Sequence, residues 1–376
     1  MGDRVNVGLV LAGGGARAAY QAGVLLAVSS MLPDPRRNPF PVICGTSAGA
    51  INATGLACAA DDFRMAAGNL AQLWRQIHID DVYQTDLVTF IRTFLHFGVS
   101  TLSGGRLWSN PRSLLDNGPL RRYLQRQVEF DGIDRSIASG ALHALALTAS
   151  CYNSGQSVTF FDGHADIGEW ARQMRVGVRE KLRIDHLMAS SALPLIFPST
   201  RVGDRYYCDG AVRQMAPLSP ALHLGARKLF VVGLAGARQA LRDNGAYPSP
   251  AQVFGHLLNS VFADSMSSDL ERLIRVNHTV SLLQGHQHLV EQTPLKRVEV
   301  FLINPSASLE DIARKHVHQF PPVLRFVLQG AGATRRRGLS LATYLLFEPG
   351  YCRELIALGY KDALRQKAAI LSFLEL

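Results

Sequence analysis

The chain has 376 residues, enough for one large α/β domain or for one domain with an extension. Apolar residues make up 47% of it, which supports a substantial core, and it contains no run of 18 apolar residues that would predict a membrane-spanning helix. A formal net charge of +9 favours an anionic membrane surface as a partner, because the chain has no helix-turn-helix, zinc-finger or RNP signature that would favour nucleic acid.

The first predicted element is a strand that leads into a glycine-rich loop. Residues 5–11 are apolar and rich in β-branched side chains, which is typical of a buried parallel strand, and residues 20–28 have helical spacing. Between them stand Gly13, Gly14, Gly15, Ala16 and Arg17. Three glycines between a strand and a helix expose backbone N–H groups that can hold a phosphate or the oxyanion of an acyl-transfer intermediate.

The same loop also fits a dinucleotide-binding fingerprint, with Gly13, Gly15 and Ala18 at the required spacing. That fingerprint needs an acidic residue about twenty positions further on, at the end of a second strand. Asp34 stands at about that distance, but it lies between two prolines in a segment where no strand ends. The sequence therefore disfavours nucleotide binding without excluding it.

A pentapeptide of small residues, Gly45-Thr46-Ser47-Ala48-Gly49, follows the short apolar run at 41–44. The pattern Gly-x-Ser-x-Gly between a strand and a helix presents a serine oxygen to substrate in α/β hydrolytic enzymes, although it also fits an ordinary strand-to-helix turn. A helix is predicted at 48–57, and its N-terminal end favours negative charge that develops at Ser47.

A possible lid insertion is predicted at about 85–120. Residues 87–97 have apolar positions at helical spacing, and residues 98–119 are rich in Gly, Ser, Asn and Pro. This pattern fits a helix packed on the core, and it also fits a lid beside the active site of an enzyme that acts on lipid.

Further strands are predicted at 142–150, with a hairpin partner at 157–162, at 227–234 and at 298–304. Strands that alternate with helices predict an α/β three-layer sandwich around a largely parallel sheet, with functional sites at the carboxyl ends of the strands. We expect a catalytic domain at 1–235 and a mainly helical extension at 236–376, which packs on that domain and contributes the strand near 298–304.

Four segments in this order resemble the patatin-like phospholipase family. They are the Gly13–Gly15 loop, the pentapeptide around Ser47, the block Ala189-Ser190-Ser191-Ala192-Leu193-Pro194 and Asp209-Gly210-Ala211. The resemblance extends over residues 5–217, and the order of the four parts is more specific than any single motif. It implies a patatin/lysophospholipase-like fold and a catalytic dyad, with Ser47 as nucleophile and Asp209 as base. It also implies an oxyanion hole of backbone N–H groups from Gly13, Gly14, Gly15, Ala16 and Arg17.

One position departs from the family pattern. Ala18 stands where the family commonly has glycine, so we expect a slightly stiffer loop and retained function, provided that this position does not need a positive φ. No histidine lies in a motif that marks it as the base. The dyad interpretation therefore predicts a direct contact between Ser47 and Asp209.

The function predicted from these residues is hydrolysis of a carboxylic ester of a lipid, of the phospholipase A or lysophospholipase type. Such an enzyme needs no metal and no cofactor. An acyltransferase with the same dyad and a catalytically silent lipid-binding module are the alternatives. The sequence indicates neither the lipid headgroup nor the oligomeric state.

Five cysteines and the start of the chain bear on localisation. The cysteines are odd in number and lack CxxC spacing, so we expect them to be reduced and mostly buried. A strand pattern begins at Val5, which leaves no room for a signal peptide. We therefore expect a cytoplasmic protein that associates peripherally with membranes.

Overall fold

The computed structural model describes residues 7–84, 113–237, 247–283, 295–334 and 338–376, and the helix predicted at 87–97 lies outside them. Within these residues, ten strands form one mixed sheet, in the order β10-β9-β1-β2-β3-β4-β6-β5, with β8 also paired to β3 and β7 to β8. The parallel strands are β10 (Glu299–Ile303), β9 (Lys228–Val232), β1 (Val7–Leu11), β2 (Val42–Thr46) and β3 (Ala144–Cys151). The others are β4 (Ser157–Gly163), β5 (Trp170–Arg172), β6 (Arg175–Arg179), β7 (Thr200–Val202) and β8 (Arg205–Asp209), of which β4 and β6 also pair in parallel with each other.

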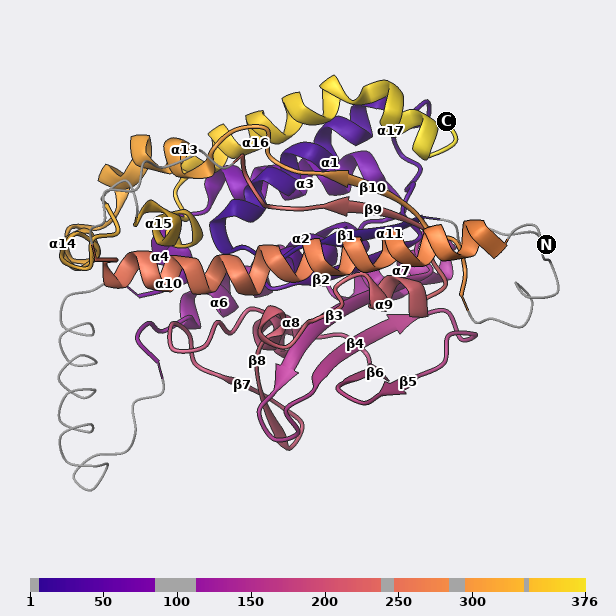
Figure 1. Cartoon of the computed structure of the whole chain (residues 1–376), viewed down its shortest axis with the longest axis horizontal. Helices are drawn as coiled ribbons and strands as arrows, with labels where there is room; N and C mark the ends of the chain where they lie inside the picture. Colours follow the sequence, from indigo (N-terminus) through magenta and orange to yellow (C-terminus); the bar gives the residue numbers. More distant parts are fainter. Residues whose placement is uncertain (1–6, 85–112, 238–246, 284–294, 335–337) are drawn as a thin grey trace.

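The parallel strands contribute side chains to two separate hydrophobic cores, one on each face of the sheet. This is because successive residues of a strand point to opposite faces. Leu9, Leu11 and Ile43 belong to the larger core, whereas Val10 and Cys44 belong to the smaller one. Helices cover both faces, so the predicted three-layer α/β sandwich around a mostly parallel sheet is confirmed (Figure 1).

The larger core is covered by helices from both ends of the chain. These are α1 (Ala19–Met31), α2 (Ala48–Ala57), α3 (Phe63–Gln76), α16 (Pro349–Arg365) and α17 (Lys367–Phe373). The smaller core lies under α9 (Ser219–His223) and α11 (Ser265–Leu283). In Figure 1, α10 (Pro250–Asn259), the π-helical turn η3 (Ser260–Asp264) and α11 form one nearly continuous rod.

The described residues contain further helices and helical turns. They are η1 (Gly15–Ala18), α4 (Ile79–Val82), α6 (Gly118–Gln127), α7 (Asp131–Ala138), α8 (Ile184–Ser190), η2 (Gly210–Val212), α13 (Leu309–His316), η4 (Val317–Gln319), α14 (Pro322–Gly330) and α15 (Leu339–Leu345). No helix among the described residues combines the length and the hydropathy needed to cross a bilayer.

Helix α16 lies along α1, as Figure 1 shows, and two glycines allow their backbones to touch. A Cβ atom at Gly23 would stand 2.1 Å from the carbonyl oxygen of Ile356, and one at Gly359 would stand 2.2 Å from that of Tyr20. The strand predicted near 298–304 is β10 at the sheet edge. Helix α16, near the C-terminus, is thus packed on α1, near the N-terminus. The domain boundary at residue 235 stays a prediction.

Candidate active site

Ser47 stands in the turn between β2 and α2 with backbone angles that L-residues rarely adopt, φ 56° and ψ −130°. The flanking glycines are required by close backbone approach. A Cβ atom at Gly45 would stand 2.4 Å from the carbonyl oxygen of Gly49, and one at Gly49 would stand 2.3 Å from that of Leu11. The turn is therefore sharp and presents the serine at the N-terminus of α2, as expected for a nucleophile elbow.

The block that ends α8 packs over this turn. Ser190 Oγ accepts a hydrogen bond from the Ser47 N–H (3.0 Å) and donates one to the carbonyl oxygen of Thr148 (2.7 Å). The Ser191 hydroxyl donates to the carbonyl oxygen of Ser47 (3.4 Å). The strained backbone of Ser47 is thus held by both serines of the Ala-Ser-Ser-Ala segment.

Asp209, at the end of β8, is the second expected residue, and the structure brings it to Ser47. Strand β8 runs antiparallel to β3 and pairs Asp209 with Ala149, so the aspartate lies beside the carboxyl ends of the parallel strands. Its N–H donates to the carbonyl oxygen of Ala192 (2.8 Å), and its Oδ1 accepts from the Ala211 N–H (2.9 Å).

The Asp209 carboxyl is fully buried, and this governs its charge. Burial raises the pKa of Asp209 from 3.8 to about 7, whereas the nearby Ser47 hydroxyl and the Ala211 N–H each lower it. Oδ2 accepts no hydrogen bond of ordinary geometry within the described residues, so the Ser47 hydroxyl interacts with the carboxyl at less than ideal geometry. A carboxyl with a pKa near neutrality beside a serine hydroxyl is suited to accept and return its proton.

The glycine-rich loop passes directly beside Ser47. A Cβ atom at Gly13 would stand 2.9 Å from Ser47 Cβ and 2.6 Å from the Phe262 ring. Gly15 has φ +56°, and a Cβ atom there would stand 2.3 Å from the carbonyl oxygen of Tyr344. The N–H groups of residues 13–15 make no hydrogen bond to any part of the chain that the structure describes. They are therefore available to a ligand.

Two buried amide side chains hold the ends of this loop. Gln21 donates to the carbonyl oxygens of Ala12 (2.8 Å) and Val232 (3.1 Å). Asn52 donates to the carbonyl oxygen of Ala18 (3.0 Å) and to Gln21 Oε1 (2.8 Å). Ala18 itself has φ −64°, so the alanine found in place of the family glycine is unstrained.

Arg17, which we expected in the oxyanion hole, uses its hydrogen-bonding groups elsewhere. Its N–H donates to the carbonyl oxygen of Gly14 (3.2 Å). Its buried guanidinium donates to Thr343 Oγ1 (2.7 Å), Asn259 Oδ1 (3.1 Å) and the Tyr344 hydroxyl (3.1 Å). Arg17 therefore ties the loop to α15 and to the end of α10.

A narrow, almost wholly apolar cavity of about 40 Å³ opens onto Ser47. Gly15 and Ser191 lie beside the serine in its lining. Large apolar side chains from α3, α6 and the chain after α8 and α15 form much of the wall: Leu73, Trp74, Leu120, Leu124, Phe197 and Phe347. Its lining suits an alkyl chain.

Several residues of the site belong to no motif that would mark them as functional in the sequence. Gln21, Asn52 and the pocket wall lie on ordinary helices, and only their placement by the fold connects them with Ser47. Ser190 and Ser191 lie within the Ala-Ser-Ser-Ala block, but their hydrogen bonds to the Ser47 backbone depend on the tertiary structure.

All five cysteines are free, and four of them are buried, as expected.

Comparison with known proteins places this geometry in context. Residues 9–222 match the family model described as patatin-like phospholipase. A protein of Pseudomonas aeruginosa named cGAMP-activated phospholipase is 28% identical over 226 residues. That match covers 57% of this chain and 55% of the relative, so the chain spans about half the length of the curated relative.

Two solved structures align with almost the whole chain at low identity. VipD of Legionella pneumophila aligns with a TM-score of 0.35 and 10% identity, over 98% of this chain and 67% of that one. Human GIVD cytosolic phospholipase A2, in complex with methyl gamma-linolenyl fluorophosphonate, aligns with a TM-score of 0.48 and 14% identity, over 99% of this chain and 59% of that one.

Proposed function

The chain belongs to the patatin-like phospholipase family, and from this premise we propose that it is a lipid acyl hydrolase that works through a Ser47–Asp209 dyad. The observation that carries the proposal is the position of Ser47. Its strained elbow lies against the buried Asp209 carboxyl, beside the Gly13 backbone and at the mouth of an apolar pocket.

The reaction proceeds in two steps. Ser47 Oγ attacks the acyl carbonyl carbon, and Asp209 takes the hydroxyl proton as the new bond forms. The oxyanion accepts hydrogen bonds from the free N–H groups of the Gly13–Gly15 loop. The C–O bond to the leaving group breaks, and the departing alkoxide takes the proton from Asp209.

Water completes the cycle. Asp209, again ionised, removes a proton from a water molecule that attacks the acyl-serine carbonyl carbon. The same loop N–H groups stabilise the second oxyanion. Collapse of this intermediate returns the proton to Ser47 Oγ and releases the fatty acid, so no metal or cofactor takes part.

The apolar lining of the pocket supports an acyl chain as the group transferred. Its wall contains no charged side chain among the described residues, and Trp74 and Phe347 stack within it with ring centroids 6.2 Å apart. Each methylene removed from water contributes about 0.8 kcal/mol, so the part of an acyl chain that enters the pocket adds to binding without any contact to its headgroup. Phospholipids and other acyl-ester lipids fit this description.

Fluorophosphonate labelling tests the dyad, since the probe reports an activated serine without needing the true substrate. We expect labelling of the wild type and of Ser267→Ala, an exposed serine on α11, and none of Ser47→Ala or Asp209→Asn. Labelling that survives Ser47→Ala would identify a different nucleophile. A folded wild type that never labels would favour the silent lipid-binding module.

Hydrolysis and acyl transfer use the same acyl-serine and differ in the acceptor. Fatty acid release from phosphatidylglycerol vesicles, measured with and without added lysophospholipid or glycerol, separates them. Free fatty acid as the main product supports hydrolysis, whereas a new acylated acceptor at the expense of fatty acid supports the acyltransferase.

The net charge of +9 supports peripheral binding to anionic membranes. Co-sedimentation of Ser47→Ala with vesicles measures this binding without hydrolysis. We expect binding to phosphatidylglycerol vesicles that weakens with salt, and little binding to phosphatidylcholine vesicles. Equal binding to both would contradict an electrostatic contribution.

A basic hollow between α1, α3 and α16 favours regulation of the hydrolase activity by a small anionic ligand. Arg64, Arg75, Arg353 and Lys361 line it with the Tyr360 ring, and none of the four cations forms an ion pair within the described residues. A concave site with four uncompensated cations suits a compact phosphate-bearing molecule better than a flat membrane surface. The activation named for the Pseudomonas relative makes cGAMP the ligand to test first.

Hydrolysis of a soluble fluorogenic ester with and without cGAMP tests this control. We expect stimulation of the wild type that is lost in Arg353→Gln/Lys361→Gln and kept in Arg201→Gln, an exposed arginine elsewhere. Equal stimulation of both variants, or none of the wild type, would refute a regulatory role of the hollow for this ligand.

A further inference from the structure

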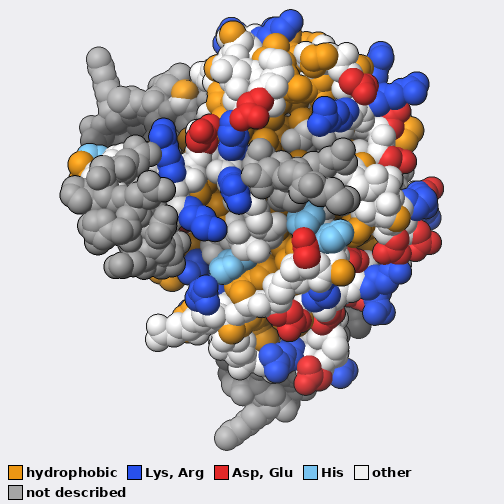
Figure 2. Space-filling model, turned by 90° about the vertical axis from the view of Figure 1, so that its right-hand side faces the viewer, with side chains coloured by type: hydrophobic (Ala, Val, Ile, Leu, Met, Phe, Trp, Pro, Cys, Tyr) orange, Lys and Arg blue, Asp and Glu red, His pale blue; other side chains and the backbone are white. Residues whose placement is uncertain are grey.

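Two histidines and an aspartate meet at the end of the sheet opposite Ser47. His143 directly precedes β3 and His164 directly follows β4, next to the antiparallel pair Ala144 and Gly163. The His164 N–H donates to the carbonyl oxygen of His143 (2.8 Å), and the two rings are nearly parallel with centroids 5.5 Å apart. Figure 2 views this end of the molecule, where histidine and acidic side chains lie next to each other at the surface.

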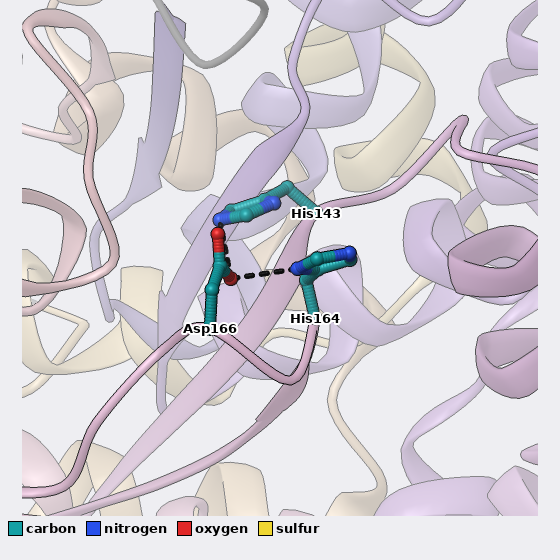
Figure 3. A group of neighbouring side chains, drawn as sticks. All are labelled: His143, His164 and Asp166. Atoms are coloured by element: carbon teal, nitrogen blue, oxygen red, sulfur yellow. Dashed lines mark hydrogen bonds and ion pairs between the residues drawn. The ribbon is translucent and has the colours of Figure 1, made fainter.

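A short turn brings Asp166 back toward both rings, as Figure 3 shows. Asp166 Oδ1 stands 2.7 Å from His164 Nδ1 and 3.9 Å from His143 Nε2. The guanidinium of Arg179, on the adjacent β6, fixes this turn by donating to the carbonyl oxygens of Gly163 (2.8 Å), His164 (2.9 Å) and Ile167. The three side chains are therefore presented by a well-supported backbone.

We propose that His143, His164 and Asp166 form a binding site for a divalent transition-metal ion of the zinc type. Metal–ligand distances of about 2.0–2.2 Å place tetrahedral ligand atoms about 3.3 Å apart. The two distances at Asp166 Oδ1, 2.7 and 3.9 Å, lie on either side of this value, and the three ligand atoms all lie within 4.8 Å of one another. Small rotations of the side chains suffice, and a water completes the fourth position.

The charges at this place suit a cation. Asp166 supplies a carboxylate, and each imidazole can present one ring nitrogen without a proton. His164 does so when its proton lies on Nε2, which replaces the hydrogen bond between Nδ1 and Asp166 Oδ1 by two bonds to the metal. The Arg179 guanidinium donates its hydrogen bonds to the carbonyl oxygens of the turn.

The donor set selects the class of ion. Two imidazole nitrogens with one carboxylate oxygen favour zinc, nickel or copper, whereas calcium and magnesium prefer sites made of oxygen ligands. A metal here joins the end of β3 to the turn after β4, so it stabilises the folded chain by binding the native state only.

Isothermal titration of the EDTA-treated full chain with zinc chloride tests the site. We expect one equivalent to bind to the wild type and to His256→Ala, which removes an exposed histidine on α10. Affinity falls at least tenfold in His164→Ala and in Asp166→Asn. The side chains of His164 and Asp166 are 60% and 63% exposed, so both variants are expected to fold normally.

Thermal unfolding supplies a second readout that does not depend on enzymatic activity. Zinc is expected to raise the Tm of the wild type and of His256→Ala, to leave His164→Ala unchanged, and magnesium at the same concentration to have no effect on any of them. Zinc affinity of His164→Ala equal to that of the wild type, or a wild type that takes up no zinc at 100 µM, overturns the proposal.

Discussion

Replacing Asp209 with asparagine is expected to make the protein more stable at neutral pH while it removes the proposed base. Burial raises the pKa of Asp209 from 3.8 to about 7. Each pKa unit corresponds to about 1.4 kcal/mol, so keeping this carboxyl ionised in the folded protein costs about 4 kcal/mol above pH 7. Asparagine has nearly the same shape and does not ionise. Its Oδ1 can still accept from the Ala211 N–H, and its amide can donate to Ser47 Oγ.

The direction of the pH dependence follows from the raised pKa. The folded protein holds this proton more tightly than the unfolded chain does, so the stabilising contribution is fully present below pH 3.8. It is lost at about 1.4 kcal/mol per pH unit as the pH rises toward 7. Asp209→Asn is therefore expected to match the wild type near pH 4 and to exceed its stability by about 4 kcal/mol at pH 8.

Urea unfolding followed by circular dichroism between pH 5 and pH 8 measures this difference. Asp204→Asn is the control, because the side chain of Asp204 is 89% exposed and its replacement should leave the pH dependence unchanged. A stability difference between Asp209→Asn and the wild type that stays constant with pH would refute the reasoning. So would a variant that loses stability relative to the wild type as the pH rises.

Three further predictions concern the site. The kcat/KM for a soluble ester should rise with pH through an apparent pKa near 7, because Asp209 accepts a proton only when it is ionised. A kcat/KM that is constant from pH 5 to pH 8 would argue against Asp209 as the base. Arg17→Met should lower the free energy of unfolding by about 3 kcal/mol and also reduce kcat, because it leaves buried partners on α15 unsatisfied. The exposed Arg201→Met should change neither quantity, and equal urea midpoints for both variants would contradict the anchoring role. Leu124→Trp should reduce kcat/KM for a sixteen-carbon ester at least tenfold and leave that for a four-carbon ester unchanged. The exposed Gln125→Trp should change kcat/KM for neither ester. Equal losses on both esters would refute the role of this pocket in binding the acyl chain.

The elements beside the nucleophile could be predicted because their signals are local. The helix predicted at 48–57 is α2, and the hairpin predicted at 142–150 and 157–162 is β3–β4. Ala18 also conforms to the expectation, since its φ of −64° is one that any residue adopts. The alternation of side chains along a strand and the need for glycine at a tight turn depend on only a few neighbouring residues. Both can therefore be predicted from a single sequence.

The rest of the site depends on contacts between distant parts of the chain. Asp209 reaches Ser47 through β8, which is antiparallel to β3 and therefore approaches from the opposite direction to the strands that carry the loop and the nucleophile. Asp209 thus lies at the carboxyl ends of the parallel strands, although the strand that carries it is antiparallel to them. The Arg17 guanidinium donates to Thr343, 326 residues away, a contact that no local pattern indicates.

The serine turn, the glycine-rich loop and the family can be read from the amino-acid order, because steric limits at glycine and the order of short motifs are local properties of the chain. The complete burial of the Asp209 carboxyl, and the apolar pocket that α3, α6 and α15 form at Ser47, depend on the tertiary fold. Burial depends on which surfaces the fold brings together. The pKa of the proposed base and the size of the acyl site are therefore properties of packing that no local pattern encodes.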